Sequence, residues 1–461
     1  MTIQSALKAL ERLLGDRLLT SDAVCAQHGE NETYYPNTPP DAVIFPENTE
    51  EVSQIVKLCN LHACPIVAYG AGTSLEAQHL PVQGGVTLDF ANMNKVLEVR
   101  DEDLTAVVQP GLTREELNTY LRDTGLFFSV DPGANASMGG MAATRASGTT
   151  AVRYGTMSDN VLALEAVMAD GTIVRTGTGA RKSASGYDLT HLLIGSEGTL
   201  GIITELTVKL HGQPEAISAA TCRFDSIEDA VNTVILTIQS GIPMARIELL
   251  DDVMVRGFNT YSKSDFPEKP HLFVEFHGST AAVAEQAESF GDIAAEFSAE
   301  AFSWTTKTEE RTALWAMRHK AHYASWSLNP GKKFLATDVC VPISKLAEAV
   351  VEAKEDSLRL GLTSTIVGHV GDGNFHCGVG IDPEDADELA RVEEFTDNLC
   401  KLALRLGGTV TGEHGIGVGK IKFMEAEHGS AVGFMQAIKA ALDPNSILNP
   451  GKIFPATNAQ R

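Results

Sequence analysis

The stretch 131-DPGANASMGGMAATRASGTTAVRYGTMSDNV-161 constrains the fold more than any other part of this 461-residue chain. It contains five glycines and many alanines, but few large apolar side chains. A core segment needs apolar surface to bury, and this stretch has little of it. Its small residues instead let the backbone run close to a ligand and offer that ligand many N–H groups. We therefore expect a ligand-binding loop region here.

Two further glycine-rich turns, 70-GAGTSLEAQ-78 and 195-GSEGTLGIITELTVKL-210, lie on either side of this stretch. The first follows a predicted strand at 65–70, but it lacks the third glycine of a Rossmann fingerprint. A nicotinamide nucleotide site is therefore disfavoured. Three small-residue loops that alternate with strands can together line one elongated dinucleotide.

Capping pairs and turn residues predict the elements around these loops. Asn48 with Glu51 and Thr113 with Glu116 are capping signals that each start a helix. Asp170-Gly171 between two strand-like runs predicts a β-hairpin. After Pro214 the chain changes to strands that alternate with helices, so we place a domain boundary near 214.

Charge and cysteine content limit the class of protein. The 60 acidic and 36 basic side chains give a net charge of -24, which argues against nucleic acid or an anionic membrane as a partner. The seven cysteines include no C-x-x-C pair and indicate free thiols in a reducing compartment. No apolar run approaches the roughly 18 residues of a membrane span, and the N-terminus lacks a signal peptide's cleavage region. We expect a cytoplasmic protein without a transmembrane segment, and a peripheral place at a membrane stays open.

The segments GAGTS, DPGANASMGGMAATRASG and GSEGTLGIITE, in this order, resemble the flavin-binding domain of the vanillyl-alcohol oxidase/p-cresol methylhydroxylase (PCMH) superfamily, in its D-lactate dehydrogenase and glycolate oxidase branch. The similarity covers nearly the whole chain. It implies an α+β fold with a two-part FAD-binding domain of the PCMH type at 1–214, which includes the N-terminal helix. A substrate or cap domain with an antiparallel sheet flanked by helices is expected at 215–415 and carries the metal site. The segment 416–461 is expected to pack back on the FAD domain.

The resemblance also implies how FAD is held. In that superfamily the first turn and the following glycine-rich segment bind the FAD pyrophosphate through backbone N–H groups, and the GTLGII strand lies along the adenosine. Some members tether FAD through a histidine in the first turn, which GAGTSL lacks, so we expect non-covalent FAD. The implied cofactor-binding residues are Gly70, Ala71, Gly72, Thr73, Ser74, Pro132, Gly133, Ser137, Gly139, Gly140, Thr144, Ser147, Gly148, Glu197, Gly198, Ile203 and Asn449.

The segment 366-IVGHVGDGNFHCGVG-380 carries two histidines around a predicted turn at Asp372-Gly373. A hairpin centred on that turn places His369 opposite His376, with Cβ atoms about 5 Å apart on one face. Two imidazoles so placed can chelate a divalent ion. From the pairing alone, a metal site and a solvent-exposed histidine pair both stay open.

The resemblance favours the metal. Relatives in this branch carry the motifs H-x-G-D-G-N-x-H and G-E-H-G, and both are present here without substitution. They imply His369, His376 and Glu413 as ligands. Two nitrogens and one oxygen suit zinc, manganese or iron, so the element stays open.

Oxidation of a 2-hydroxy acid also requires a base for the hydroxyl proton and groups that bind the carboxylate. His414, beside a ligand, is the natural base because neutral imidazole accepts a proton near neutral pH, although it can equally be a structural histidine. Asn374 can donate to the substrate carboxylate or serve only as a turn residue. The resemblance places Arg318 and Lys333 near that carboxylate and leaves His322 to tune side-chain preference.

The sequence therefore predicts an FAD- and metal-dependent dehydrogenase that transfers hydride from a D-2-hydroxy acid to flavin. The stretch 330-PGKKFLATDVCVPISKL-346 looks closest to the D-lactate branch, with D-2-hydroxyglutarate and glycolate as competing substrates. A metal-dependent hydrolase and a non-catalytic flavoprotein subunit are the alternatives from other classes. Because the chain has no iron–sulfur cysteine cluster, electrons must pass to a separate quinone, cytochrome or electron-transfer flavoprotein. A homodimer is compatible with the sequence.

Overall fold

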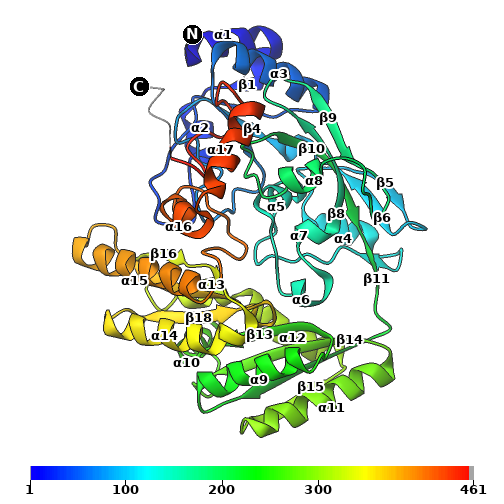
Figure 1. Ribbon diagram of the computed structural model, residues 1–461, viewed down its shortest axis with the longest axis vertical. Coiled ribbons are helices and arrows are strands. Elements are labelled where there is room, and N and C mark those ends of the chain that lie inside the picture. The colour runs from blue at the N-terminus through cyan, green and yellow to red at the C-terminus, as the bar shows by residue number, and fades with distance from the viewer. Residues whose placement is uncertain (1, 456–461) are drawn as a thin grey trace. The chain divides into compact units, whose positions relative to one another are not determined.

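Figure 1 shows the computed structural model, which describes residues 2–455 apart from the side chains of Ala301, Ala313, Ala316, Met317 and His319. The chain divides into two compact units. The first consists of Met1–Ser147, Gly155–Gln213 and Glu413–Arg461, and the second of Gly148–Tyr154 and Pro214–Gly412. The division after Gln213 lies one residue from the boundary expected near 214. The short segment Gly148–Tyr154, expected in the first domain, instead belongs to the second unit.

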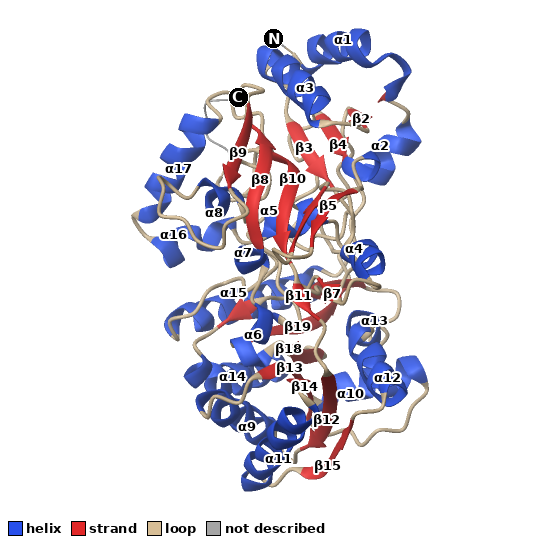
Figure 2. Cartoon of the chain, turned by 90° about the vertical axis from the view of Figure 1, so that its right-hand side faces the viewer, coloured by secondary structure: helices blue, strands red, loops and turns tan. Residues whose placement is uncertain are grey.

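The first unit contains two main sheets. The strands of a four-stranded sheet, in the order β1-β2-β4-β3, are β1 (Leu18–Leu19), β2 (Ala42–Ile44), β4 (Val86–Asp89) and β3 (Ile66–Tyr69). The strands of an antiparallel five-stranded sheet, in the order β5-β6-β10-β8-β9, are β5 (Val96–Arg100), β6 (Thr105–Val108), β10 (Ile202–Lys209), β8 (Val161–Val167) and β9 (Ile173–Gly177). The short strands β7 (Leu126–Phe127) and β11 (His211–Gly212) pair with each other. Figure 2 shows β8, β9 and β10 side by side.

Short and medium helices surround these sheets. The α-helices of the first unit are α1 (Ile3–Leu14), α2 (Asp22–His28), α3 (Thr49–His62), α4 (Arg114–Leu121), α5 (Met138–Thr144), α7 (Met157–Asn160), α8 (Leu189–Leu193), α16 (Met424–His428) and α17 (Ala431–Leu442). Three 3-10 helices, η1 (Gly15–Arg17), η2 (Phe90–Asn92) and η5 (Ile421–Phe423), connect them.

The local signals of the sequence are confirmed in this unit. Asn48 caps α3 by accepting the Glu51 N–H, and Thr113 forms a capping box with Glu116 at the start of α4. β8 and β9 form the predicted hairpin, with Gly171 at φ 80° in the turn. Capping and turn signals succeed because they depend only on neighbours within the same turn of chain.

The C-terminal segment belongs to the first unit, and its backbone hydrogen-bonds to the edge strand β3. The Ile66 N–H donates to the Ile447 carbonyl at 2.7 Å, and the Asn449 N–H donates to the Ile66 carbonyl at 2.8 Å. Ile447 and Leu448 are buried in the same apolar core as Ile66. The tail therefore extends the edge of β3, which leads directly into the first glycine-rich turn.

The second unit is built on one antiparallel eight-stranded sheet. Seven strands lie in the order β15-β12-β14-β13-β18-β19-β16, and β17 also pairs with β19. Their bounds are β12 (Ala216–Arg223), β13 (Met244–Leu250), β14 (His271–Gly278), β15 (Glu300–Thr305), β16 (Lys333–Ala336), β17 (Val339–Cys340), β18 (Ser364–Gly368) and β19 (Asn374–Ile381). The expected antiparallel sheet flanked by helices is confirmed.

Different helices cover the two faces of this sheet. The helices of the unit are α6 (Ala151–Tyr154), α9 (Ile227–Gln239), α10 (Asp252–Ser262), α11 (Thr280–Glu296), α12 (Thr308–His319), α13 (Ala321–Trp326), α14 (Leu346–Arg359) and α15 (Ala386–Arg405), with 3-10 helices η3 (Ile343–Lys345) and η4 (Val370–Asp372). On one face, Phe276 of β14 packs against Phe290 of α11. On the other, Phe273 shares a core with Phe258 of α10 and Trp315 of α12. Successive strand residues point to opposite faces, so Phe273 and Phe276 mark the two sides.

Gly373, in the loop between β18 and β19, provides a test of how closely this loop approaches the backbone of Val341. Gly373 has φ +78°, and a Cβ there would lie 2.1 Å from the Val341 carbonyl oxygen. Gly407, at the end of α15, has φ +79° with open space around it. We predict that Gly373→Ala lowers the free energy of unfolding by about 1–3 kcal/mol more than Gly407→Ala, because only the first adds a steric clash to the backbone strain. Urea unfolding of the flavin-loaded variants, followed by circular dichroism, measures the difference, and equal losses would contradict the close approach.

Candidate active site

The two motif histidines lie around the loop between β18 and β19. The structure pairs Val367 with His376, so the predicted register, which placed His369 opposite His376, is wrong by two residues. The difference arises because the turn is longer than expected: η4 and Gly373 occupy it. A two-residue shift keeps each side chain on its face of the sheet. The two rings therefore still meet, with centroids 5.7 Å apart.

The side chains of His369, His376 and Glu413 form a set of candidate metal ligands. Their ligand atoms all lie within 4.8 Å of one another, and the same holds for Asp338, His376 and His414. Glu413, expected within the second domain, begins the last segment of the first unit and directly follows Gly412, the last residue of the second unit. Two imidazole nitrogens and a carboxylate oxygen within this distance suit one divalent ion.

Hydrogen bonds determine which nitrogen each histidine presents. His369 Nδ1 lies 2.7 Å from Glu248 Oε1, and His376 Nδ1 lies 3.0 Å from the Thr337 carbonyl oxygen. Carboxylates and carbonyls only accept, so both Nδ1 atoms carry the proton and both Nε2 atoms keep the lone pair. This tautomer is the one that a histidine needs in order to bind a metal through Nε2. The donor set therefore fits a divalent ion.

Arg318 binds a buried carboxylate that sequence reasoning missed. Its Nε and Nη2 lie 2.7 Å and 2.6 Å from Glu248 Oε2. Glu248 lies on β13 and has no exposed surface. One oxygen of this carboxylate therefore accepts from both Nε and Nη2. The signal that could have revealed Glu248 is an acidic residue inside the apolar strand 244-MARIELL-250.

Asn374 holds a different position from the one expected. Its Nδ2 donates to Asp338 Oδ1 at 2.7 Å and to the Val339 carbonyl at 2.9 Å, so both N–H groups are used within the protein. It therefore does not have a donor to spare for a substrate carboxylate. Asp338, also missed by sequence reasoning, is fully buried and accepts from Thr411 Oγ1 at 2.6 Å. A Cβ on Gly412 would lie 2.2 Å from Asn374 Nδ2, which explains a glycine directly before Glu413.

The remaining expected residues of this site differ in placement. Lys333 pairs with Ile381, which lies five residues along β19 from His376. Five residues of extended strand span about 16 Å, and an odd number of residues places the two side chains on opposite faces of the sheet. The structure therefore does not bring Lys333 to the ligand set, because the register of β16 carries it away. His322 packs edge-on against Phe334 at 4.8 Å, and the end of the Phe334 ring approaches Gly378 on the same face as His376.

In the first unit the three glycine-rich loops come together. A Cβ on Gly70 would lie 2.0 Å from Ser137 Oγ, the cap of α5. The Gly195 and Glu197 N–H groups donate to the carbonyls of Ala142 and Ala143 at 2.9 Å and 2.8 Å. Loops that are distant in sequence thus lie together, and their small residues can let the backbone run close to a ligand. This arrangement fits the FAD site that the resemblance implies.

Several other cofactor residues can be placed individually. Gly133 and Gly198 have open space where a Cβ would be, as expected for backbone that faces a ligand. Ile203, by contrast, is packed into the apolar core. Ser74 Oγ lies 2.6 Å from His79 Nδ1, and His79 Nε2 lies 3.0 Å from the Glu30 carbonyl. Both ring nitrogens of this nearby histidine are therefore engaged within the protein.

Glu197 and Asn449 use their side chains to join segments of the first unit. The Glu197 carboxylate accepts the Ile416 N–H at 2.6 Å and the Gly417 N–H at 2.8 Å. Burial raises the pKa of Glu197 to about 7, and these two N–H groups oppose that rise. Asn449 Nδ2 donates to the carbonyls of Gln78 and Glu197. Both side chains therefore hold the C-terminal segment against the glycine-rich turns.

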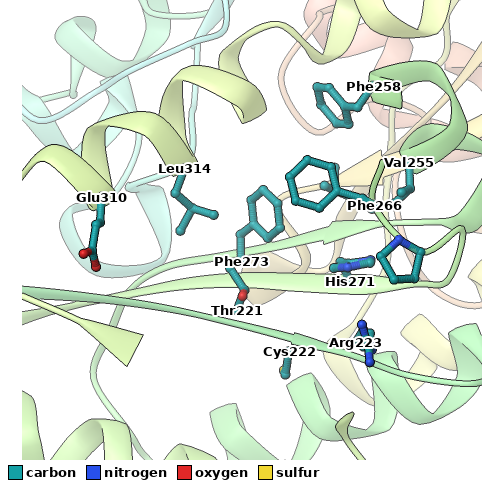
Figure 3. Close-up of a pocket in the computed structure, with 12 residues that line it drawn as sticks. Thr221, Cys222, Arg223, Val255, Phe258, Phe266, His271, Phe273, Glu310 and Leu314 are labelled. Carbon is teal, nitrogen blue, oxygen red and sulfur yellow. The ribbon is translucent and has the colours of Figure 1, made fainter. Parts of the chain in front are cut away.

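A cavity of about 380 Å³ in the second unit lies apart from the ligand set. Figure 3 shows the rings of Phe258, Phe266 and Phe273 gathered in it, with Glu310 and Arg223 at separate sides. Among the described residues that line it, none is a proposed metal ligand and none is proposed to bind the substrate carboxylate. We therefore do not assign the reaction to this cavity.

Within the part of the chain that the structure describes, no helix combines the length and the apolar character needed to cross a bilayer.

Curated proteins resemble the chain over almost its full length. It is 47% identical over 460 residues to "Probable D-lactate dehydrogenase, mitochondrial" of Danio rerio, covering 99% of this chain and 93% of the relative. It is 43% identical to "D-lactate dehydrogenase [cytochrome], mitochondrial" of Arabidopsis thaliana, covering 97% and 79%. It is 37% identical to "Glycolate oxidase subunit GlcD" of Bacillus subtilis (strain 168), covering 90% and 89%.

These names correct one expectation. The assignment to the cytoplasm is wrong by this comparison, because the relatives from Danio rerio and Arabidopsis thaliana are named as mitochondrial proteins. Cysteine content could not distinguish the compartments, because free thiols are compatible with any reducing environment.

Solved structures support the fold. 4-Ethylphenol oxidase from Gulosibacter chungangensis matches with a TM-score of 0.80 at 19% identity, covering 99% of this chain and 98% of that chain. p-Cresol methylhydroxylase matches with a TM-score of 0.77 at 18% identity, with the same coverage. The expected two-domain fold of the PCMH type is thus confirmed.

The contact between Gly70 and Ser137 provides a test of the flavin site. We predict that Gly70→Ala lowers FAD occupancy, because the added Cβ displaces Ser137 Oγ from the N-cap of α5. Gly212→Ala is the matched control, since its Cβ meets open space and Gly212 is not among the implied cofactor-binding residues. The ratio of flavin to protein absorbance after purification measures occupancy. A ratio that falls equally in both variants would show that the close approach is not what shapes the site.

Two family models cover most of the chain. Residues 40–177 match the model described as "FAD binding domain", and residues 213–453 match "FAD linked oxidases, C-terminal domain". The first match contains the loops that meet at Gly70 and Ser137, and the second contains the proposed metal ligands. Together with the relatives, these matches show that the chain belongs to the family of FAD-linked oxidases.

Proposed function

We propose that this FAD-linked enzyme oxidises a D-2-hydroxy acid, with D-lactate as the preferred substrate, and that it requires a divalent metal. The observation that carries the metal requirement is the convergence of His369, His376 and Glu413 within 4.8 Å. Support for D-lactate comes from the relatives of Danio rerio and Arabidopsis thaliana, which are named as D-lactate dehydrogenases.

The chain's own residues suggest how such a substrate would be held. When bound, FAD supplies a two-electron acceptor and the divalent ion supplies Lewis-acid polarisation. Arg318 Nη1 binds the substrate carboxylate, because Nε and Nη2 are already committed to Glu248. The rings of His322 and Phe334 limit the size of the substrate side chain.

His414 is the proposed base for the hydroxyl proton. It lies within the group formed with Asp338 and His376, and neutral imidazole accepts a proton at physiological pH. A carboxylate as deeply buried as Asp338 can stabilise the imidazolium that forms. The proton therefore has an acceptor on the protein that is separate from the three proposed metal ligands.

A separate electron carrier is proposed to reoxidise the flavin. The Arabidopsis thaliana relative carries "[cytochrome]" in its name, which favours a cytochrome over a quinone or an electron-transfer flavoprotein. The sequence contains no C-x-x-C pair of the kind that binds iron–sulfur clusters, which supports transfer to a separate carrier.

Glycolate is the second candidate substrate, because the Bacillus subtilis relative is named as a glycolate oxidase subunit. D-2-hydroxyglutarate would need a further cation for its second carboxylate. Lys333 does not supply that cation in this structure, because it lies on the opposite face of the sheet. The hydrolase alternative leaves the three glycine-rich loops without a role.

We predict that D-lactate bleaches the oxidised flavin faster than L-lactate, glycolate or D-2-hydroxyglutarate. Anaerobic mixing of the flavin-loaded protein with each acid measures the rate from the visible flavin absorbance. Removal of metal by a chelator is expected to abolish the bleaching, and added zinc or manganese to restore it. Equal or faster reduction by D-2-hydroxyglutarate or glycolate would overturn the D-lactate assignment.

We also predict that His414→Ala slows flavin reduction by about 100- to 10,000-fold, as expected for loss of a general base. His191→Ala is the control, because His191 is an exposed histidine of the first unit that bonds to Asp188. Flavin and metal contents should match those of the unchanged protein in both variants. A reduction rate that does not fall in His414→Ala would identify a different base.

A further inference from the structure

One buried carboxylate joins the proposed metal site to the proposed anion site. We propose that Glu248 is a positioning residue that sets the ligand tautomer of His369, using the carboxylate oxygen that Arg318 does not occupy. This inference deepens the proposed function and rests on it, because it assumes that His369 binds the metal. Neither motif carries Glu248, which lies more than a hundred residues earlier in the chain.

The two oxygens of Glu248 have different partners. Oε2 accepts from Arg318 Nε at 2.7 Å and Nη2 at 2.6 Å, while Oε1 accepts from His369 Nδ1 at 2.7 Å. With no exposed surface, Glu248 has no water to replace either partner. Arg318 therefore fixes the orientation of the carboxylate, and the carboxylate in turn fixes the proton of His369 on Nδ1.

The position of that proton decides whether His369 can be a ligand. A metal ion binds only the nitrogen that carries the lone pair. If Nδ1 has no acceptor, or faces a donor, the proton moves to Nε2 and blocks that atom. Glu248 thus acts on metal binding without touching the ion.

A neighbouring carboxylate provides a matched control. Glu275 on β14 is 3% exposed. Its Oε1 lies 2.9 Å from His277 Nε2 and 3.4 Å from Arg246 Nη1. Glu275 therefore has the same two types of partner in the same sheet, but His277 is outside the candidate ligand set. A loss of metal affinity that arises merely from removing a buried charge should be similar in the Glu248 and Glu275 variants.

The first variant is Glu248→Gln. In this variant we expect the amide oxygen to stay with Arg318, whose charged N–H groups need an acceptor. The amide NH2 group then donates to His369 Nδ1 and drives the proton to Nε2. Flavin-loaded protein is stripped of metal and titrated with Zn²⁺ and with Mn²⁺ in competition with a chelator. The dissociation constant should rise about 10- to 100-fold in Glu248→Gln and stay unchanged in Glu275→Gln.

The second variant is the double exchange Glu248→Gln with Arg318→Met. Without Arg318 the amide can rotate and turn its oxygen to His369 Nδ1, which restores the ligand tautomer. We therefore expect the second exchange to recover most of the metal affinity that the first one removes. A purely structural role predicts the reverse, because a second core substitution should add to the damage. The double variant also removes both buried charges, so it carries the test if Glu248→Gln alone fails to fold.

The nitrogen chemical shifts of labelled histidine report the tautomer directly in the metal-free protein. His369 should be protonated on Nδ1 in the unchanged protein and in the double variant, and on Nε2 in Glu248→Gln. The inference is overturned if the tautomer does not change, or if Glu248→Gln and Glu275→Gln bind metal equally well. If the unchanged protein binds neither ion, the metal requirement of the proposed function fails. The tautomer measurement then still decides the role of Glu248.

Discussion

The carboxylate of Glu248 is buried in the central strand of the eight-stranded sheet, and the positions of Arg318 and His369 depend on how that charge is paired. A buried charge that loses its partner costs roughly 3–5 kcal/mol, so its partners must be in place in the folded protein. Those partners are Arg318 on α12 and His369 in the loop after β18. The two contacts of Glu248 therefore require the sheet, α12 and the loop after β18 to assemble together. Arg318, the proposed partner of the substrate carboxylate, and His369, a proposed metal ligand, obtain their positions from that assembly.

The first unit is organised by close approach of backbone segments. Gly70 lies so near Ser137 that a methyl group would not fit, and the loop at 195–199 bonds to the backbone of α5. Polar side chains then close this arrangement from the C-terminal side: Glu197 binds two backbone N–H groups, and Asn449 binds two carbonyls. The glycines and the buried polar groups thus serve the same end, which is to bring three distant loops to one region.

The two units differ in how much of each could be predicted. In the first, the caps at Asn48 and Thr113 and the turn at Gly171 were correct from sequence, because each depends on residues within one turn of chain. In the second, the hairpin around the motif histidines was predicted two residues out of register, because η4 lengthens its turn. The two histidine rings still meet, because side chains on a strand return to the same face every two residues and a shift of two residues leaves the face unchanged.

The sequence by itself determined which candidate groups are present: small residues that can line a dinucleotide, two histidines and a glutamate that resemble the metal ligands of relatives, and a neighbouring histidine that we propose as the base. These could be read because each motif is contiguous and its residue types suit only a few kinds of chemistry. Tertiary structure alone decided which partners orient them. Glu248 and Asp338 orient candidate site residues from distant strands and loops, while Lys333 is carried to the opposite face by the register of β16. Such placements depend on the pairing of strands far apart in the chain, and no local pattern of residues encodes that pairing.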